Sequence, residues 1–328
     1  MAENSQKPEY FIGVDLGGTK ILSAIFTSGM KCIAKSKVST KASRGPDVVI
    51  DRVARCVTDA IDEADLNPTQ IKAIGIGAPG AVNSDEGKVI FAPNLGWENV
   101  ALKRILEKEL QVPVYLENDC NLCTLGVYHV ELAAKPKFVL GLFLGTGIGG
   151  GIILDGKIYS GFNRTAGEVG HMVIEVGGPK CGCGNRGCFE ALAGRAAMFK
   201  RIQSDVRNGQ KTILTEILGD DLEDMRSGDL RKAIRRGDKY LERVVEEAAE
   251  YTGIAIANLI NVLNPEVVVV GGGVIDALED EMMAIIVETA MDNSMPGTTK
   301  GIDIIPSKLG DLAGVTGGAV LAKQSSKS

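Results

Sequence analysis

The first third of the chain alternates between two patterns of apolar residues. Short apolar runs that end in a glycine, a proline or an acid predict buried strands at residues 10–18, 71–79 and 112–119. Apolar positions at helical spacing predict amphipathic helices at residues 47–64 and 100–110. This alternation of strands and helices is typical of an α/β fold.

Two more strands follow the first one directly. Residues 20–27 and 31–40 are apolar runs separated by a turn at Ser28–Gly29, and they predict a β-meander. The connection between the first two strands is a glycine loop.

The same opening recurs in the second half. Residues 137–151 predict a strand that runs into a second glycine loop, and residues 151–161 predict a hairpin around Asp155–Gly156. A buried strand of parallel type at residues 265–274 runs into a third glycine loop. Further helical regions are predicted at residues 188–204, 211–236, 238–263 and 311–324.

The repeated opening predicts two related α/β lobes around a cleft, with a boundary near Asp119–Cys120. We expect a small lobe of residues 1–119, completed by a C-terminal helix in residues 311–328. Residues 120–310 are expected to form a large lobe.

Composition narrows the class of protein. The 328 residues are 45% hydrophobic, which is enough for a full core, and the net charge of −6 argues against nucleic-acid and anionic-membrane partners. The polar N-terminus has no apolar signal core, and no apolar run is long enough to span a membrane. We therefore expect a cytoplasmic protein whose seven cysteines are thiols or metal ligands rather than disulfides.

The glycine loops favour a nucleotide. In "DLGGTK", the backbone NH groups and Thr19 can hold phosphate and Asp15 can hold Mg²⁺ through water, although a plain turn is the alternative. The loop "LGTGIGGG" has Rossmann spacing but runs into a strand instead of a helix, and the chain has no Walker A string. The third loop, "VVVGGGV", offers backbone for a base or ribose. Together the three loops predict a nucleotide cleft.

An acid ends the strand predicted at residues 112–119. Asp119 either caps the following helix or acts as a general base for phosphoryl transfer, and Asn118 would orient the same substrate. Cys120 and Cys123 have redox or zinc spacing, but their run looks helical, so packing as small apolar residues is the favoured interpretation.

The stretch "GHMVIEVGGPKCGCGNRGCFE" has metal-ligand chemistry. His171, Cys181, Cys183 and Cys188 predict a closed Cys₃His zinc site of the structural kind, with no open position for a catalytic water. Unmetallated thiols in a turn are the alternative. A pinned loop would also fix Glu168, His171 and Glu190, whose carboxylates and imidazole suit a polyhydroxy ligand such as a sugar.

The strings "GVDLGGTK", "LGTGIGGG", "GEVGH" and "CGCGNRGCFEALAG" closely resemble the bacterial ROK family of repressors, open reading frames and sugar kinases. The resemblance runs from Gly13 to about Ala322. It implies the actin-like, hexokinase-like ATPase fold. Cys120, after the aspartate, is its least familiar position.

The resemblance implies a role for each matching residue. By this resemblance, Asp119 matches the position of the family's catalytic base. The family's zinc ligands are matched by His171, Cys181, Cys183 and Cys188. The implied sugar-site residues are Pro79, Gly80, Asn94, Asn118, Asp119, Glu168, His171 and Glu190. The implied nucleotide-binding residues are Asp15, Gly17, Gly18, Thr19, Lys20, Thr146, Gly147, Gly272 and Gly273.

The expected activity is ATP-dependent phosphorylation of a hexose at its 6-hydroxyl, with Mg²⁺ bridging the phosphates and glucose as the favoured sugar. Kinases for N-acetylglucosamine, N-acetylmannosamine or fructose are alternatives, and polyphosphate is an alternative donor. A sugar-sensing regulator is the rival from another class; the dozen residues before the first glycine loop leave no room for a DNA reader, which favours the enzyme. We expect a homodimer, as is frequent in the family.

Overall fold

The computed structural model describes residues 8–219 and 222–327. The chain divides into two compact units. The first contains the residues up to Lys137, Gly151–Ala166 and the residues from Asp311 onward; the second contains Phe138–Gly150 and Gly167–Gly310. The lobe boundaries expected from the sequence stay a prediction.

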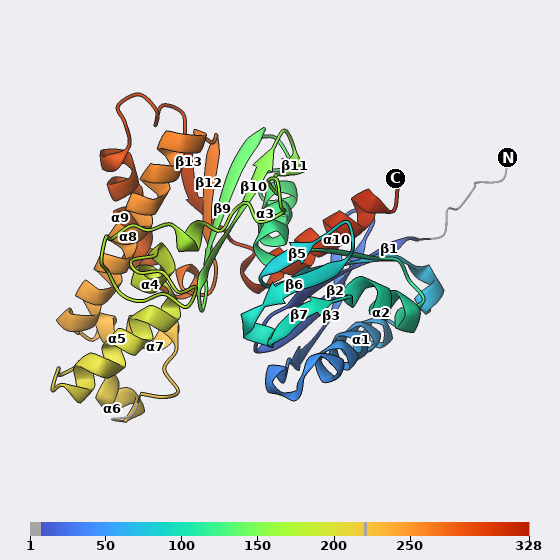
Figure 1. Cartoon of the computed structure of the whole chain (residues 1–328), viewed down its shortest axis with the longest axis horizontal. Coiled ribbons are helices and arrows are strands. Elements are labelled where there is room, and N and C mark those ends of the chain that lie inside the picture. Colours follow the sequence, from blue (N-terminus) through green and yellow to red (C-terminus); the bar gives the residue numbers. More distant parts are fainter. Residues whose placement is uncertain (1–7, 220–221, 328) are drawn as a thin grey trace. The chain divides into compact units, whose positions relative to one another are not determined.

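The first sheet carries the predicted meander. Its strands are β1 (Tyr10–Leu16), β2 (Lys20–Thr27), β3 (Cys32–Ser39), β4 (Ile71–Ala78) and β8 (Val114–Asn118), in the order β3-β2-β1-β4-β8 (Figure 1). β1, β2 and β3 are antiparallel neighbours, whereas β4 and β8 run parallel to β1. The carboxyl ends of β1, β4 and β8 therefore lie at one edge of the sheet.

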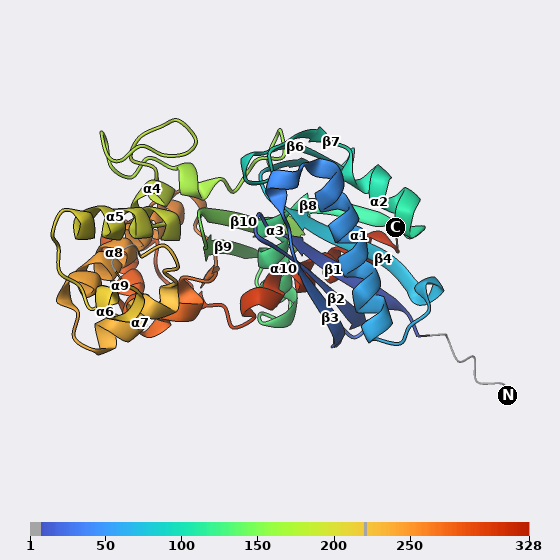
Figure 2. The same ribbon diagram turned by 90° about the horizontal axis from the view of Figure 1, so that it is seen from below.

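Helices cover both faces of this sheet (Figure 2). On one face, α1 (Pro46–Glu63) contacts β2 and β3 and joins a core that also includes α2 (Leu102–Leu110). On the other face, α10 (Ala313–Ser325) lies against β1, β4 and α3 (Asp119–Val130).

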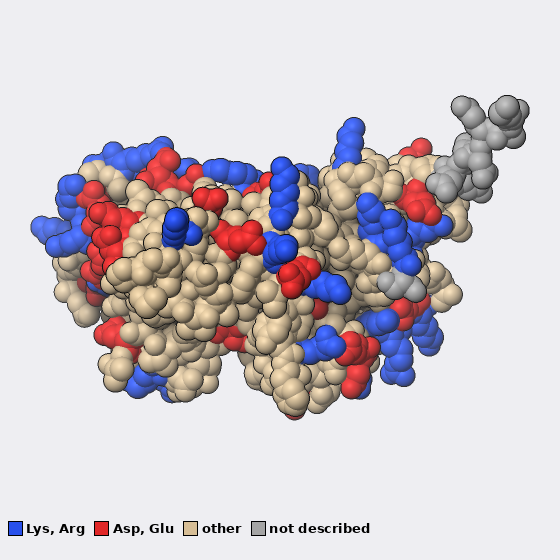
Figure 3. All heavy atoms as spheres, turned by 90° about the horizontal axis from the view of Figure 1, so that it is seen from above, with Lys and Arg blue, Asp and Glu red and all other residues tan. Residues whose placement is uncertain are grey.

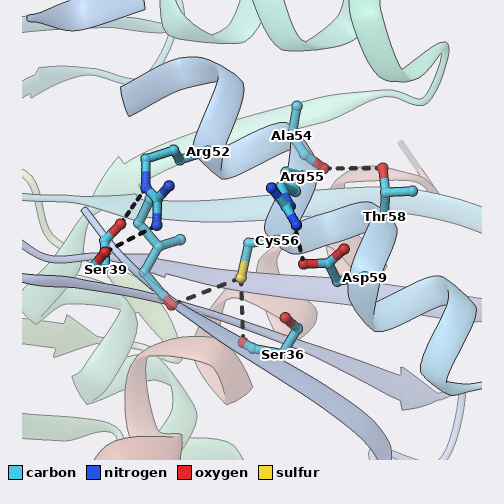
Figure 4. A network of polar contacts seen from close by, with 9 residues as sticks. Ser36, Ser39, Arg52, Ala54, Arg55, Cys56, Thr58 and Asp59 are labelled. Atoms are coloured by element: carbon cyan, nitrogen blue, oxygen red, sulfur yellow. Dashed lines mark hydrogen bonds and ion pairs between the residues drawn. The ribbon is translucent and has the colours of Figure 1, made fainter. Parts of the chain in front are cut away.

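Polar contacts fix α1 on the meander, as Figure 4 shows. The Arg52 guanidinium donates to the Ser39 carbonyl and to its hydroxyl oxygen, the latter at 3.0 Å. The buried Cys56 thiol donates to the Ser36 carbonyl at 3.3 Å. These contacts hold α1 against the C-terminal part of β3.

The second sheet repeats the first. Its strands are β9 (Phe138–Leu144), β10 (Ile148–Leu154), β11 (Lys157–Ile158), β12 (Val267–Gly271) and β13 (Asp303–Pro306), in the order β11-β10-β9-β12-β13. In both sheets the third, second, first, fourth and fifth strands follow one another across the sheet. The repeated opening expected from the sequence is confirmed.

Some elements differ from the sequence prediction. A three-stranded sheet of β5 (Ala81–Asn83), β6 (Lys88–Ala92) and β7 (Trp97–Val100) was not predicted. It is built from strands of only three to five residues, too short for a clear alternating pattern.

The helices of the second unit also differ in part. The single helix expected at residues 188–204 is wrong, because Gly194 adopts an extended conformation between α4 (Phe189–Ala193) and α5 (Arg195–Arg207). The region 211–236 contains α6 (Leu214–Leu218) and α7 (Ser227–Arg235), and its residues 220 and 221 lie outside the described residues. The long helix α8 (Lys239–Leu263) is confirmed, whereas α9 (Ile275–Asn293) was not predicted.

The surface agrees with the modest net charge. Figure 3 shows Lys and Arg side chains interspersed with Asp and Glu side chains, without a continuous basic area on the face in view. Among the described residues, no helix combines the length and apolar character needed to cross a bilayer.

Helix α10 approaches the first sheet very closely. A Cβ atom on Gly75 would lie 2.0 Å from the Gly318 carbonyl oxygen, and one on Gly13 would lie 1.6 Å from the Val315 carbonyl oxygen. Only glycine fits at these two strand positions, because backbone atoms of the helix occupy the space of a side chain. This packing sets the distance of α10 from the carboxyl end of β1.

Replacement of Gly75 tests this packing. We expect Gly75→Ala to lower the free energy of unfolding by about 3 kcal/mol, because the added methyl group meets backbone that cannot rotate away. Urea denaturation measures the change. Gly228→Ala in α7 is the matched control, since its Cβ would meet no atom within 4 Å. Equal stability of the two variants would contradict the close approach.

Candidate functional site

The first glycine loop is a tight connection between β1 and β2. The Gly17 amide donates to the Lys20 carbonyl at 3.0 Å, and the Thr40 hydroxyl donates to the Gly17 carbonyl at 2.6 Å. The Thr40 amide also donates to the Thr19 carbonyl at 2.9 Å. Asn94 lies against the loop, because a Cβ on Gly18 would be 3.3 Å from the Asn94 carbonyl oxygen.

Lys20 ends this loop with its charge already paired. Its Nζ atom lies 2.5 Å from a carboxylate oxygen of Asp311, whose other oxygen is 3.4 Å from Lys37 Nζ. The Lys20 hydrogen bond is the main cause that lowers the pKa of Asp311. Because the lysines and Asp311 remain partly exposed, an anionic ligand can compete for Lys20.

The carboxyl edge of the first sheet collects the other predicted groups of this unit. Asp15 pairs in register with Gly77, which pairs in register with Glu117 on the neighbouring strand. Pro79 and Gly80 follow β4 at this edge, and Asp119 follows β8 as the first residue of α3. Parallel strands whose carboxyl ends meet in this way form the usual ligand-binding edge of α/β sheets.

Asn118 is the N-cap of α3. Its Oδ1 atom accepts from the amides of Cys120 and Asn121 at 2.9 and 3.1 Å, and its Nδ2 atom donates to the Gly80 carbonyl at 3.2 Å. Each polar atom of the Asn118 amide therefore has a protein partner. The side chain joins the start of α3 to the Pro79–Gly80 turn, whether or not it also binds a sugar.

Glu117 was given no role from the sequence, yet its hydrogen bonds connect the end of β8, the start of α3 and Ser84. The buried carboxylate accepts from the Asn118 amide at 2.9 Å, from Asn121 Nδ2 at 3.0 Å and from the Ser84 hydroxyl at 2.9 Å. A buried carboxylate with three donors is stabilised by its hydrogen bonds. It fixes the backbone from which Asp119 projects.

Asp15 lies close enough to Asp119 for the two charges to interact. Burial, followed by the charge of Asp119, raises the pKa of Asp15 from 3.8 to about 7, and the smaller effect of Lys20 opposes the rise. A proton is therefore retained near neutral pH in the absence of a cation.

Cys120 and Cys123 lie on α3, which confirms the predicted helix. Burial is the largest cause that raises the pKa of the Cys123 thiol well above its usual range, and the Asp15 and Asp119 charges add to it. A Cβ on Gly314 would lie 3.5 Å from Cys123 Sγ. Cys123 thus packs between α3 and α10 as a neutral thiol.

In the second unit, His171, Cys181, Cys183 and Cys188 converge. One ligand atom from each lies within 4.8 Å of all the others. Cys183 Sγ and Cys188 Sγ are 3.7 Å apart, as are Cys181 Sγ and His171 Nδ1. Two thiolates bound to one tetrahedral zinc lie about 3.8 Å apart, so the donor set and its spacing fit Zn²⁺.

The two ring nitrogens of His171 face different groups. Nδ1 faces the cysteine cluster, and Nε2 lies 3.9 Å from a carboxylate oxygen of Glu168. His171 ends a short 3₁₀ helix (Val169–His171), with Glu168 immediately before it. The residues present would hold a metal through Nδ1 and leave Nε2 directed toward Glu168.

Glu190 connects this cluster to the second glycine loop. Its Oε2 atom accepts from the Ile148 amide at 3.0 Å, and its Oε1 atom lies 3.9 Å from Cys181 Sγ. A Cβ on Gly147 would lie 2.1 Å from Glu190 Oε2, so a side chain at this position would displace the carboxylate from the loop. The metal-type cluster and the loop are parts of one assembly.

The second and third glycine loops meet at the end of β9. The Val274 amide donates to the Leu144 carbonyl at 3.0 Å, and a Cβ on Gly272 would lie 2.6 Å from the same oxygen. Thr146 and Gly147 follow Leu144 directly. The structure therefore brings the predicted phosphate loop and the predicted adenosine loop of this unit together.

The predicted residues thus form one group in each unit. The first unit contains Asp15, Gly17, Gly18, Thr19, Lys20, Pro79, Gly80, Asn94, Asn118 and Asp119. The second unit contains Thr146, Gly147, Glu168, His171, Cys181, Cys183, Cys188, Glu190, Gly272 and Gly273. Arg195 and Asp311, which contact Thr146 and Lys20, were not found from the sequence.

The repeated sheets and strand-end loops define the class as the hexokinase-like ATPase fold, and comparison with known proteins gives the family. The ROK family model matches residues 11–325. Glucokinase of Halalkalibacterium halodurans is 35% identical over 320 residues, covering 97% of this chain and 96% of the relative. The chain belongs to the ROK family.

Solved structures and regulators are also similar. A ROK family glucokinase from Streptomyces griseus, in complex with glucose and AMPPNP, has a TM-score of 0.85 at 30% identity and covers 96% of this chain and 99% of its own. A xylose repressor from Caldicellulosiruptor bescii is 32% identical over 260 residues, covering 79% of this chain and 65% of the repressor.

The metal cluster is tested by removing one thiol. We expect Cys183→Ser to lose bound zinc and to lower the free energy of unfolding by about 4 kcal/mol, because a tetrahedral site with three ligands no longer clamps the loop. Elemental analysis and thermal unfolding measure both effects. Cys32→Ser in β3 is the control. A folded and fully active Cys183→Ser protein without metal would refute the scaffold role.

The raised pKa of Asp15 predicts a pH-dependent stability. A carboxyl group whose pKa is higher in the folded state opposes folding once it ionises, so its favourable contribution is complete below pH 3.8 and is lost as the pH rises to about 7. Because Asp15 retains some solvent access, we expect Asp15→Asn to stabilise the protein at pH 8 by about 2 kcal/mol.

Urea denaturation without nucleotide or Mg²⁺ measures this stabilisation. The gain shrinks as the pH falls toward 3.8, because below that value wild-type Asp15 becomes protonated in the unfolded state as well as in the folded one. Asp51→Asn on the exposed side of α1 serves as the control, with little change expected at either pH. A gain of the same size at pH 4 and pH 8 would show that charge is not its cause.

Proposed function

We propose that this chain is an ATP-dependent hexose kinase that converts glucose to glucose 6-phosphate. The observation that carries the proposal is the carboxyl edge of the first sheet, where Asp119 is held beside the Asp15–Lys20 loop by Asn118 and Glu117. The similarity to glucokinases over nearly the whole chain supports it. So does the likeness to a glucokinase structure in complex with glucose and AMPPNP.

Asp119 is the proposed general base. Its carboxylate accepts the proton of the sugar 6-hydroxyl while the oxygen attacks the γ-phosphorus of ATP, and the bond from the γ-phosphorus to the ADP oxygen breaks. The products are ADP, the sugar phosphate and the proton held by Asp119. The fixed N-cap geometry of Asn118 orients this base, since positioning contributes much of the rate of phosphoryl transfer.

The remaining groups bind and orient the reactants. The proposed sugar ligands are Asn94, Asn118, Glu168, His171 and Glu190, with Pro79 and Gly80 as a backbone wall. The proposed nucleotide contacts are the three glycine loops. When bound, Mg²⁺ would neutralise charge on the phosphates. Zinc, held by His171 and the three cysteines, would keep Glu190 and the His171 ring in place.

Two alternatives have their own support. The xylose repressors among the relatives favour a regulator that binds sugar without turnover. Kinases for N-acetylglucosamine, N-acetylmannosamine or fructose would share the groups described and differ in the pocket around the second carbon of the sugar. A homodimer and a cytoplasmic location are part of the proposal.

Replacement of the proposed base separates chemistry from binding. We expect Asp119→Asn to lower kcat by about 10³-fold, because the amide cannot accept the hydroxyl proton, while glucose affinity changes less than about threefold. A coupled ADP assay and calorimetry measure the two quantities. Asp62→Asn, on the exposed side of α1, is the control. Turnover near the wild-type value would remove Asp119 from this role.

A panel of sugars and donors identifies the reaction. Glucose with ATP is expected to give the highest kcat/KM among glucose, N-acetylglucosamine, N-acetylmannosamine and fructose, each tested with ATP and with polyphosphate. Preference for another sugar would replace glucose in the proposal. Sugar binding without turnover of any of them would establish the regulator instead.

A further inference from the structure

Arg195 begins α5 directly beside the second glycine loop. Its amide donates to the Gly145 carbonyl at 3.2 Å, and the Ala196 amide donates to the Thr146 carbonyl at 3.0 Å. Its Nη2 atom donates to the Thr146 hydroxyl oxygen at 2.7 Å. A Cβ on Gly273 would lie 3.9 Å from Nη1, so the guanidinium lies beside both glycine loops of the second unit.

No carboxylate in the described part of the chain neutralises the charge of this guanidinium. Among residues 8–219 and 222–327, no carboxylate forms an ion pair with Arg195. Glu190, the acid of the neighbouring helix, directs its carboxylate to the Ile148 amide and Cys181 instead. A guanidinium on a half-buried residue, without a counter-ion among the described residues, is a strong site for phosphate, which its fork of donors matches in shape.

The contact with Thr146 also sets the direction of the threonine proton. A hydroxyl has one proton to donate and two lone pairs, whereas a guanidinium only donates. The Thr146 oxygen must therefore accept from Arg195, and its own proton is directed to another acceptor. Arg195 and Thr146 together present two kinds of donor to one anion.

A role in holding the second glycine loop does not explain why residue 195 is an arginine. The two backbone hydrogen bonds from the first turn of α5 already fix Gly145 and Thr146. An apolar or neutral polar residue at position 195 would keep both bonds. The guanidinium adds a positive charge beside the loop, and a charge acts on a ligand more than on a neutral backbone.

We propose that Arg195 binds the phosphate chain of an adenine nucleotide, with the Thr146 hydroxyl donating to the same phosphate oxygens. This inference deepens the proposed kinase function and rests on it. It adds to the glycine loops a charged side chain that recognises the phosphates rather than the base or ribose.

Calorimetry with ADP and with adenosine tests the assignment on the full chain. We expect Arg195→Gln to weaken ADP binding by roughly 10- to 100-fold, the loss of one or two charge-assisted hydrogen bonds, and to leave adenosine binding within twofold. Arg195→Lys should recover part of the ADP affinity, because it keeps the charge but not the fork. In turnover, KM for ATP should rise while KM for glucose stays unchanged.

Two further variants isolate the cause. Thr146→Val removes the hydroxyl proton and should weaken ADP but not adenosine, whereas Thr146→Ser should bind ADP as the wild type does. Arg201→Gln, on the same helix but paired with Glu247, is the matched control and should leave the ratio of ADP to adenosine affinity unchanged.

The outcomes separate this inference from the function on which it rests. Arg195→Gln that binds ADP as the wild type does, or that loses ADP and adenosine equally with a lower Tm, overturns the phosphate role. A wild-type chain that binds no adenine nucleotide overturns both. If the wild type binds ADP but phosphorylates no hexose, only the kinase proposal fails, and the ADP-to-adenosine ratio still decides the role of Arg195.

Discussion

The second unit depends on a carboxylate that is held at both oxygens. Glu190 lies between Cys181 of the metal-type cluster and the Ile148 amide of the second glycine loop. Movement of the cluster therefore moves the loop, and the loop in turn receives the first turn of α5 through Gly145 and Thr146. A short, glycine-rich stretch without a core of its own gains a fixed shape in this way. The metal-type cluster thus fixes the second glycine loop through the contacts of Glu190.

In the first unit, a buried acid holds the polar groups at the strand ends in place, where the second unit uses the metal-type cluster. Glu117 gathers donors from Ser84, Asn118 and Asn121, and Asn118 caps the helix that Asp119 begins. Asp119, the proposed base, is thereby attached to the end of a strand and the start of a helix, both of which are rigid elements. The two units use different chemistry to hold polar groups at strand ends, although their sheets share one strand order.

Much of the fold could be predicted from the sequence, because long apolar runs and strand-end glycines are local signals. The meander, α1, α8 and the repeated strand–loop–strand opening were predicted for this reason. β5–β7 and β13 were missed because three to five residues carry too little periodicity. The break at Gly194 depends on the loop that α5 meets. In the site, the spacing of the cysteines predicted the metal-type cluster. The roles of Glu117 and Arg195 could not be predicted, because they depend on contacts with Ser84 and Thr146, which are 33 and 49 residues away in the sequence.

The packing of α10 against the glycines of the first sheet also has a consequence for the synthesis of the protein. The apolar residues Phe11, Leu22 and Phe26 are covered by Val315, Ala319 and Ala322, nearly 300 residues later in the chain. A ribosome releases the N-terminal sheet long before it releases the helix that buries this face. The nascent chain therefore carries an uncovered apolar surface through most of translation, and the first unit completes its core only after the second has emerged. Chaperone binding during synthesis would accordingly concentrate on the N-terminal meander.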